Sequence, residues 1–232
     1  MKRFMTIAVP ALALVIAVVF GVFAWNTWLF PQQLDYDHTP VWKPGTVQSE
    51  SPSSPIPVPS AQLPDNCSRT QEPIVPTRFI ISRMGVDTHV LALGKDPTTG
   101  AAEAPPDEDA YGVAWFDLGP KPGSDKGNVV LSTHTYHRGT ALGNDLYDPT
   151  KGLQPGDIIK VQDASGKTVC YRYREALKVW VDEYNASPSN VLYDDTGRAQ
   201  LAIIICWNYD WNANMSKSRI IFYADPLVAA TG

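Results

Sequence analysis

The chain has 232 residues, with 24 acidic and 19 basic side chains, a formal net charge of −5 and a pI near 5.3. This length accommodates one membrane anchor, one linker and one globular domain of about 150 residues. Nucleic-acid-binding proteins carry a basic patch or a basic overall charge, so an acidic chain with 20 prolines argues against that class.

The first predicted element is a membrane span. Lys2 and Arg3 precede residues 7–25, a run of 19 apolar residues, and about 20 such residues cross a bilayer core as a helix. The basic start favours a cytoplasmic N-terminus, which would leave the remainder outside the cell. A cleaved signal peptide is the alternative, but residues 22–24 form a poor cleavage site. We therefore expect residues 1–30 to be a cytoplasmic stub and a single-pass anchor in the cell membrane.

The next predicted segment, residues 31–73, is rich in proline and serine. It holds nine of the 20 prolines, and such a composition favours extended, polyproline-like backbone over a packed core. A semi-rigid spacer of this kind extends about 3 Å per residue. We expect an extracellular linker, with a ligand for a proline-recognition module as the alternative.

Residues 74–232 have the pattern of a β-rich domain. Short runs of β-branched and aromatic residues alternate with Gly, Pro, Asp and Asn. The predicted strands are residues 77–82, 88–93, 128–133, 157–162, 167–180, 200–206 and 218–224. The predicted helical turns are residues 107–111, 142–147 and 188–192. This pattern predicts a mainly β fold, a closed antiparallel or mixed barrel with short helices in the connections, preceded by one transmembrane helix.

Cys206 is the first candidate for chemistry. It ends the apolar run 201–206, directly before the polar loop 208–217. A reactive cysteine needs partial exposure and a positive neighbour that lowers its pKa, and a strand end that faces a loop provides the exposure. Taken alone, Cys206 fits a small apolar core residue equally well.

Two further polar residues stand at predicted strand ends. His134 could serve as a general acid or as the charge partner of a thiolate, with His137 as a rival in the same loop. These two histidines and one cysteine give too few ligands for zinc. If the last strand pairs with the strand of Cys206, the Arg219 guanidinium would lie beside the thiol and could stabilise an oxyanion. The alternative for Arg219 is protection of a strand edge.

The cysteine count offers a second inference about Cys206. The chain has three cysteines, so pairing of Cys67 with Cys170 would leave Cys206 as the odd thiol of an exported protein. Cys67 and Cys170 are therefore the disulfide candidates, and two unpaired thiols are the alternative.

The order His134, Cys206, Arg219 resembles the arrangement of the sortase family, over about residues 76–224. In that family a strand-end histidine, a cysteine after an apolar strand and an arginine that opens the next strand form the catalytic set. Three further segments resemble the family: residues 85–90, 122–131 and 153–159. The chain departs from the family pattern at Thr133, where glycine is common, and at Ile205, where threonine is common.

The resemblance implies a cysteine transpeptidase that is anchored in the membrane of a Gram-positive cell. Cys206 would attack a Leu-Pro-x-Thr-Gly-like sorting signal of a surface protein, with His134 as proton donor and acceptor and Arg219 at the oxyanion. The thioester would pass to the amine of a peptidoglycan precursor or a pilin. No metal or organic cofactor is expected for this chemistry. The compact barrel favours class E or F within the family.

Other interpretations stay open at this point. The chain could be another exported cysteine peptidase or peptidoglycan transpeptidase, or a non-catalytic barrel that binds wall polymer. Trp207 and Tyr209, together with Thr133 and Ile205, are the candidate contacts for the sorting peptide; alternatively, the aromatic residues anchor the loop. The acidic cluster 107–109 could contribute to a calcium site, as in some sortases, or form a solvated turn.

Overall fold

The computed structural model describes residues 18, 39–43, 56–59, 62–185 and 191–230. The chain divides into two compact units, one of residues 1–34 and 136–140 and one of residues 35–135 and 141–232. The second unit carries the sheet and is described below. Apart from Val18, the expected membrane span lies outside the described residues, and the helices within the described part are too short or too polar to cross a bilayer.

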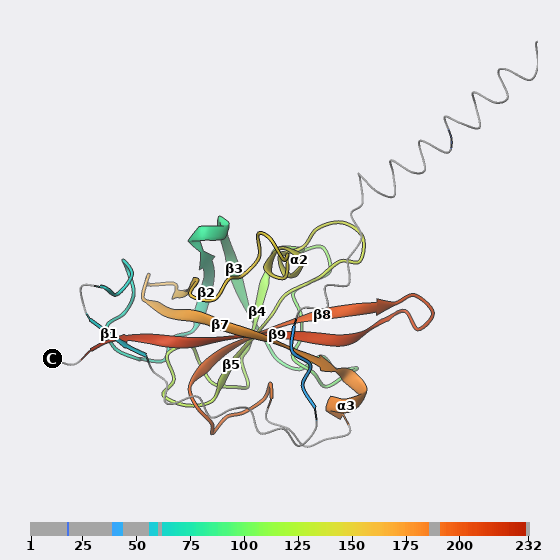
Figure 1. Ribbon diagram of the computed structural model, residues 1–232. Helices are drawn as coiled ribbons and strands as arrows, with labels where there is room; N and C mark the ends of the chain where they lie inside the picture. The colour runs from blue at the N-terminus through green and yellow to red at the C-terminus, as the bar shows by residue number, and fades with distance from the viewer. Residues whose placement is uncertain (1–17, 19–38, 44–55, 60–61, 186–190, 231–232) are drawn as a thin grey trace, which may run out of the picture. The chain divides into compact units, whose positions relative to one another are not determined.

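The second unit is a closed, mainly β barrel (Figure 1). The elements in chain order are β1 (Ile56–Val58), β2 (Pro76–Ile81), the 3-10 turn η3 (Ser82–Met84), β3 (Val86–Leu93), β4 (Val113–Phe116), β5 (Asn128–Ser132), α2 (Leu142–Leu146), β6 (Ile158–Asp163), β7 (Thr168–Trp180), α3 (Val181–Asn185), β8 (Gln200–Asp210) and β9 (Met215–Ala229). The strand order is β1-β9-β7-β6-β2-β3-β4-β5-β8, and β8 also pairs with β9. This last pairing closes the eight strands β2 to β9 on themselves and leaves β1 at the edge.

Alternation along the strands separates an inner face from an outer face of the barrel. In β8, Leu201, Ile203 and Ile205 belong to the inner core cluster, together with Phe79, Leu131 and other buried side chains. Ala202 and Ile204 belong to an outer cluster instead. The period of two along a strand therefore decides which residues of β8 fill the barrel and which lie on its outside.

Most of the expected strands form, and the structure adds two strands that were not predicted, β4 and β1. β4 is four residues long and was not predicted, because a run this short gives little periodicity to detect. Residues 107–111 form turns rather than the expected helical turn, whereas α2 forms within the expected range 142–147. Of the expected turn 188–192, residues 188–190 lie outside the described residues.

The structure differs from the expectation of an extended linker at residues 39–43 and 56–59. The amide of Trp42 donates to the carbonyl of Lys178 at 2.8 Å, and the Trp42 ring is buried in the outer cluster. β1 pairs in parallel with the end of β9, Pro57 opposite Val228. Both segments lie at sheet edges, where a proline without an N–H is tolerated, and each brings an apolar side chain to bury. The proline-rich segment therefore contributes to the barrel.

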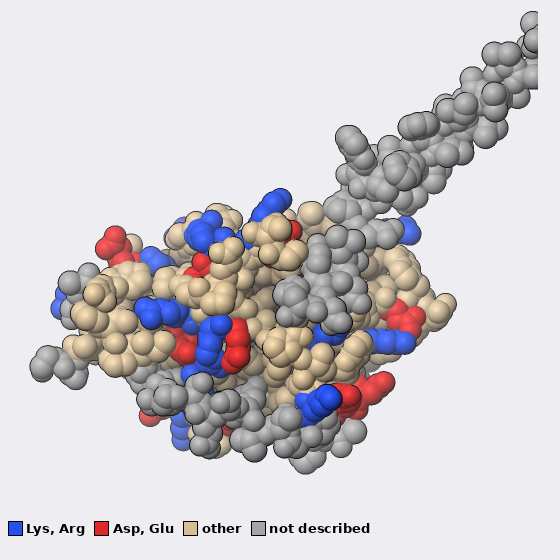
Figure 2. Space-filling view, viewed as in Figure 1, with Lys and Arg blue, Asp and Glu red and all other residues tan. Residues whose placement is uncertain are grey.

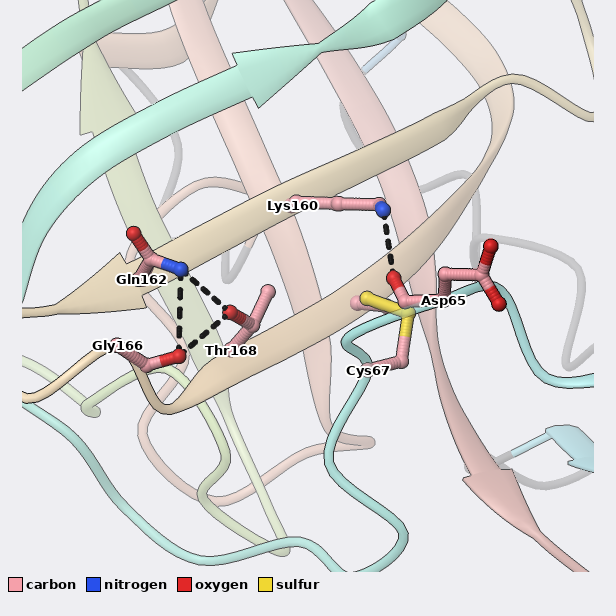
Figure 3. The surroundings of a disulfide bond; sticks show 7 residues. Asp65, Cys67, Lys160, Gln162, Gly166 and Thr168 are labelled. Carbon is pink, nitrogen blue, oxygen red and sulfur yellow. Dashed lines mark hydrogen bonds between the residues drawn. A yellow bond between two sulfur atoms is a disulfide. The ribbon is translucent and has the colours of Figure 1, made fainter.

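A disulfide joins this segment to the barrel. Cys67 is bonded to Cys170 in β7, with 5.6 Å between their Cα atoms (Figure 3). Beside it, the Lys160 ammonium donates to the carbonyl of Asp65 at 2.7 Å. Cys206 is outside the disulfide and exposed.

Replacing Cys67 and Cys170 together with alanine is expected to lower the free energy of unfolding by about 3–4 kcal/mol, because the bond restricts the unfolded chain over a separation of 103 residues. Urea unfolding of the double variant and the wild type would measure this. Cys206→Ala is the matched control and should leave the midpoint unchanged. A double variant with the wild-type midpoint would show that the bond contributes nothing to stability.

The charged side chains on the face seen in Figure 2 are mixed in sign. Lysine and arginine residues alternate with aspartate and glutamate residues instead of gathering into one field. This distribution agrees with the exclusion of a polyphosphate-binding surface on that face.

Candidate active site

Cys206 lies on the outer face of the barrel. Its neighbours in β8, Ile205 and Trp207, are buried, whereas Cys206 is exposed. This follows from the alternation of β8, since Ala202 and Ile204 face outward at the two preceding even positions. The thiol is thus presented to solvent by a strand whose other face is fixed in the core.

Arg219 lies directly opposite Cys206. β8 and β9 are antiparallel and pair Ile204 with Ile221 and Cys206 with Arg219. Paired residues project from the same face, so the guanidinium and the thiol share the outer face. Arg219 Nη1 donates to the carbonyl oxygens of Ser216 and Ser218 at 3.1 and 2.9 Å, and a guanidinium carries five N–H donors in all.

His134 approaches Cys206 from the other neighbouring strand. β5 and β8 are parallel and pair Val130 with Ala202 and Ser132 with Ile204. The contact continues past β5, where the Thr133 amide donates to the Ile204 carbonyl at 3.3 Å. Extending the same register two residues past the end of β5 would set His134 level with Cys206, and the next residue, Thr135, donates from its hydroxyl to the Cys206 carbonyl. We call these three residues the His–Cys–Arg row: His134 just past β5, Cys206 in β8 and Arg219 in β9.

The imidazole of His134 is oriented by backbone carbonyls. Its Nε2 lies 2.6 Å from the carbonyl oxygen of Pro105 and 3.2 Å from that of Pro106. A carbonyl can only accept, so Nε2 is the nitrogen that carries a proton in these contacts. The segment before β4 thereby fixes both the ring orientation and the tautomer.

Tyr193 shows that the charge of Arg219 is felt on the same outer face. Its hydroxyl accepts a bond from the Ala102 amide at 2.7 Å, and its ring contacts Phe116 edge-on. Burial raises the pKa of Tyr193, while the Ala102 amide and the positive charge of Arg219 act in the opposite direction.

A buried polar network holds the loop that precedes β8. Asn128 Nδ2 donates to the carbonyl of Leu192 at 2.8 Å, and Gln200 Nε2 donates to Asn128 Oδ1 at 2.8 Å. Arg174 donates to Gln200 and also forms an ion pair with Asp225. The loop beside the outer face is therefore fastened to the barrel at its described end.

Three of the four residues expected to contact the peptide are buried. Ile205 is 1% exposed in the inner core, and Trp207 is 2% exposed with its ring edge-on to Tyr147. Thr133 is buried as well, and its hydroxyl donates to the carbonyl of Gly112 at 2.7 Å. These side chains point into the protein, so a contact with a bound peptide stays a prediction for all three.

Tyr209 and its neighbours form the hairpin between β8 and β9. The Tyr209 hydroxyl donates to Asn214 Oδ1, and the Tyr209 and Trp211 rings pack edge-on at 5.1 Å. A contact of Tyr209 with a peptide stays a prediction. Ile204, two positions before Cys206, is a partly buried residue of the outer face.

The acidic cluster 107–109 engages a histidine. Asp109 Oδ2 lies 2.7 Å from Nε2 of His89, in β3. Among the described residues, the cluster does not join any group of three or more side chains suited to hold a metal ion.

Comparisons with known proteins identify the family of the chain. Residues 79–227, more than half of the chain, match the family model described as the sortase domain. No curated protein matches. Solved structures with a similar fold include sortase C1 of Streptococcus agalactiae, which is 15% identical over 67% of this chain and 68% of that chain, with a TM-score of 0.43. Sortase C from Clostridium perfringens is 16% identical over 71% of this chain and 76% of that chain, with a TM-score of 0.43. Sortase C-1 from Actinomyces oris is 21% identical over 66% of this chain and 75% of that chain, with a TM-score of 0.42.

An exposed cysteine on a barrel strand, flanked by a histidine after one neighbouring strand and an arginine on the other, is the arrangement of a thiol-dependent acyl-transfer enzyme. Because the family model covers more than half of it, the chain belongs to the sortase family. It is a cysteine transpeptidase.

Proposed function

We propose that this enzyme cleaves a Leu-Pro-x-Thr-Gly-like sorting signal of surface proteins and transfers them, through a thioester, to an amine of a peptidoglycan precursor or a pilin. The observation that supports this most directly is the His–Cys–Arg row on the outer face. Cys206 is exposed on that face, whereas the inner face of β8 is filled by the core.

We assign the nucleophile to Cys206. Its thiolate attacks the threonine carbonyl carbon, and the carbonyl oxygen becomes an oxyanion. Arg219, on the paired position of β9, donates hydrogen bonds to that oxygen. His134 gives a proton to the leaving amine as the C–N bond breaks, which leaves a thioester on Cys206. The acceptor amine then attacks the thioester, His134 takes its proton, and the thiolate departs.

We further propose that the enzyme acts outside a Gram-positive cell, held by residues 1–30 in the membrane. The apolar run 7–25 supports this placement, and so does the disulfide, since such bonds persist in oxidising compartments. We retain a linker within residues 31–73 and a catalytic domain within residues 74–232. The packing of Trp42 and β1 on the barrel indicates that the folded part begins before residue 74.

The test of this function uses the full-length chain with a panel of sorting peptides and a small amine acceptor. We expect a product in which the peptide, cut after threonine, is joined to the amine, and we expect it in the presence of a metal chelator. Mass spectrometry of the reaction detects the product. Release of neither fragment from any peptide in the panel would contradict the proposal.

Ile204 and Ile205 provide a paired prediction about the two faces of β8. Ile205→Ala is expected to lower the free energy of unfolding by about 2–5 kcal/mol, because it empties part of the core, with KM unchanged. Ile204→Ala is expected to raise KM about fivefold through loss of about 1 kcal/mol of apolar contact with the peptide. Peptide titrations and urea unfolding of both variants measure this. The reverse pattern would place the peptide elsewhere.

A further inference from the structure

The first turn of α2 touches the segment after β5 that carries His134 and the residue before Cys206 in β8. The amide of Gly143 donates to the carbonyl of His134 at 2.8 Å. A β-carbon placed on Gly143 would lie 2.5 Å from that carbonyl oxygen, 2.7 Å from Thr135 Cγ2 and 2.9 Å from Ile205 Cγ2. Real Cβ contacts of this length essentially do not occur, so any side chain at position 143 would displace the backbone of His134 or the residue before Cys206.

α2 has little freedom to retreat from this contact. Leu142 and Leu146 are buried in the inner core, and the Leu142 amide donates to the carbonyl of Ala110 at 2.9 Å. Directly after the helix, Tyr147 packs edge-on against Trp207 with ring centroids 4.6 Å apart. A clash at Gly143 would therefore be relieved at the histidine side, where the chain is half-buried, rather than by movement of the helix.

A second contact ties the histidine segment to the nucleophile itself. The Thr135 hydroxyl donates to the carbonyl oxygen of Cys206 at 2.6 Å. This bond bridges the residue after His134 and the main chain of Cys206. Together with the Gly143 bond, it fixes the separation of the two backbones that carry the imidazole and the thiol.

We propose that Gly143 and Thr135 are positioning residues, which act through the main chains of His134 and Cys206 and set the distance over which proton and charge are exchanged. The inference rests on the proposed function for its effect on turnover, but the geometry also governs the reactivity of the Cys206 thiol without any substrate. Neither residue was singled out by the sequence pattern.

The first experiment compares Thr135→Val with Thr135→Ser in the full-length chain. Valine keeps the shape of threonine without a donor, whereas serine keeps the donor. Thr135→Val is expected to lower kcat about 10-fold with KM within about twofold, and to change the pH profile of Cys206 alkylation, because small displacements of reacting groups cost rate. Thr135→Ser should restore both. Equal behaviour of the two variants, either both like the wild type or both impaired, would overturn the role of the hydroxyl.

The second experiment compares Gly143→Ala with Gly94→Ala. A β-carbon on Gly94 meets nothing closer than Asp117 Oδ1 at 3.8 Å, so this variant is the matched control. Gly143→Ala is expected to lower kcat about 100-fold and to alter the alkylation profile, with Gly94→Ala unchanged. A Gly143→Ala enzyme with wild-type kcat and pH profile would overturn the proposal. If the wild type transfers no peptide, the proposed function fails, and the alkylation profiles still decide the positioning role.

Discussion

Replacing Cys206 with alanine is expected to lower the rate of peptide transfer by about 10⁴-fold or more. The thiol forms the covalent intermediate, and removing the nucleophile of a covalent enzyme leaves only what binding and oxyanion stabilisation contribute. The side chain is exposed on the outer face, so its loss creates no core cavity. The initial rate of amine-linked product, measured at equal concentrations of folded wild type and variant, tests this.

Cys67→Ala/Cys170→Ala is the control for Cys206→Ala. It removes the other two thiols and should retain transfer activity at temperatures where it is folded. If Cys206→Ala kept more than about a tenth of the wild-type rate, the nucleophile would have to be another group, and the His–Cys–Arg row could not be the catalytic set.

Replacing Arg219 with lysine is expected to lower kcat about 10²-fold with a smaller effect on KM. Lysine keeps the positive charge but lacks the planar fork that can hold an oxygen from a fixed strand position. Loss of one oxyanion donor typically costs about 10²- to 10³-fold in kcat. Steady-state kinetics with saturating acceptor amine give the split between kcat and KM.

Arg172→Lys provides the comparison for this prediction. Arg172 is a half-buried arginine of β7, paired in register with Asp225 and away from the Cys206 position of the sheet. The Arg172→Lys substitution should leave kcat unchanged. An Arg219→Lys enzyme with at least half of the wild-type kcat would show that charge alone suffices and that the fork holds no oxygen in the transition state.

Much of the barrel was predictable from local pattern. The strands near His134, Cys206 and Arg219 were predicted from their apolar runs. Their ends were predicted wrongly, because β8 continues to Asp210 and β9 begins at Met215, so Cys206 and Arg219 lie inside strands. β4 was missed because four residues show too little periodicity. β1 was missed because proline is depleted in strands, and its pairing with β9 depends on an edge more than 160 residues away in sequence.

The candidate site was predictable in its members but less so in its surroundings. The pairing of Cys206 with Arg219 was expected on condition that the last two strands pair, and they do. Ile205 and Trp207 were expected beside the peptide from their position next to Cys206, but the alternation of β8 turns both side chains inward, whereas Ile204 shares the outer face with Cys206. Neighbours in a strand lie on opposite faces, so proximity in sequence does not predict a shared face.

The contacts that hold the site could not be read from the sequence. Gly143 lies nine residues after His134 and is one of 16 glycines, with no local motif to mark it. Its role appears when α2 is packed against the segment after β5 and against Ile205 in β8. The same is true of Pro105, whose carbonyl orients the His134 ring from a connection between other strands.

The mass of the enzyme after reaction with a sorting peptide, in the absence of an acceptor amine, tests the central claim most directly. We predict an acid-stable, hydroxylamine-sensitive adduct equal in mass to the peptide up to its threonine, which maps after digestion to the fragment that contains Cys206. The adduct should be absent from Cys206→Ala and should disappear when the amine is added. Formation of the transfer product with no adduct on Cys206, or with the adduct on another residue, would contradict the account.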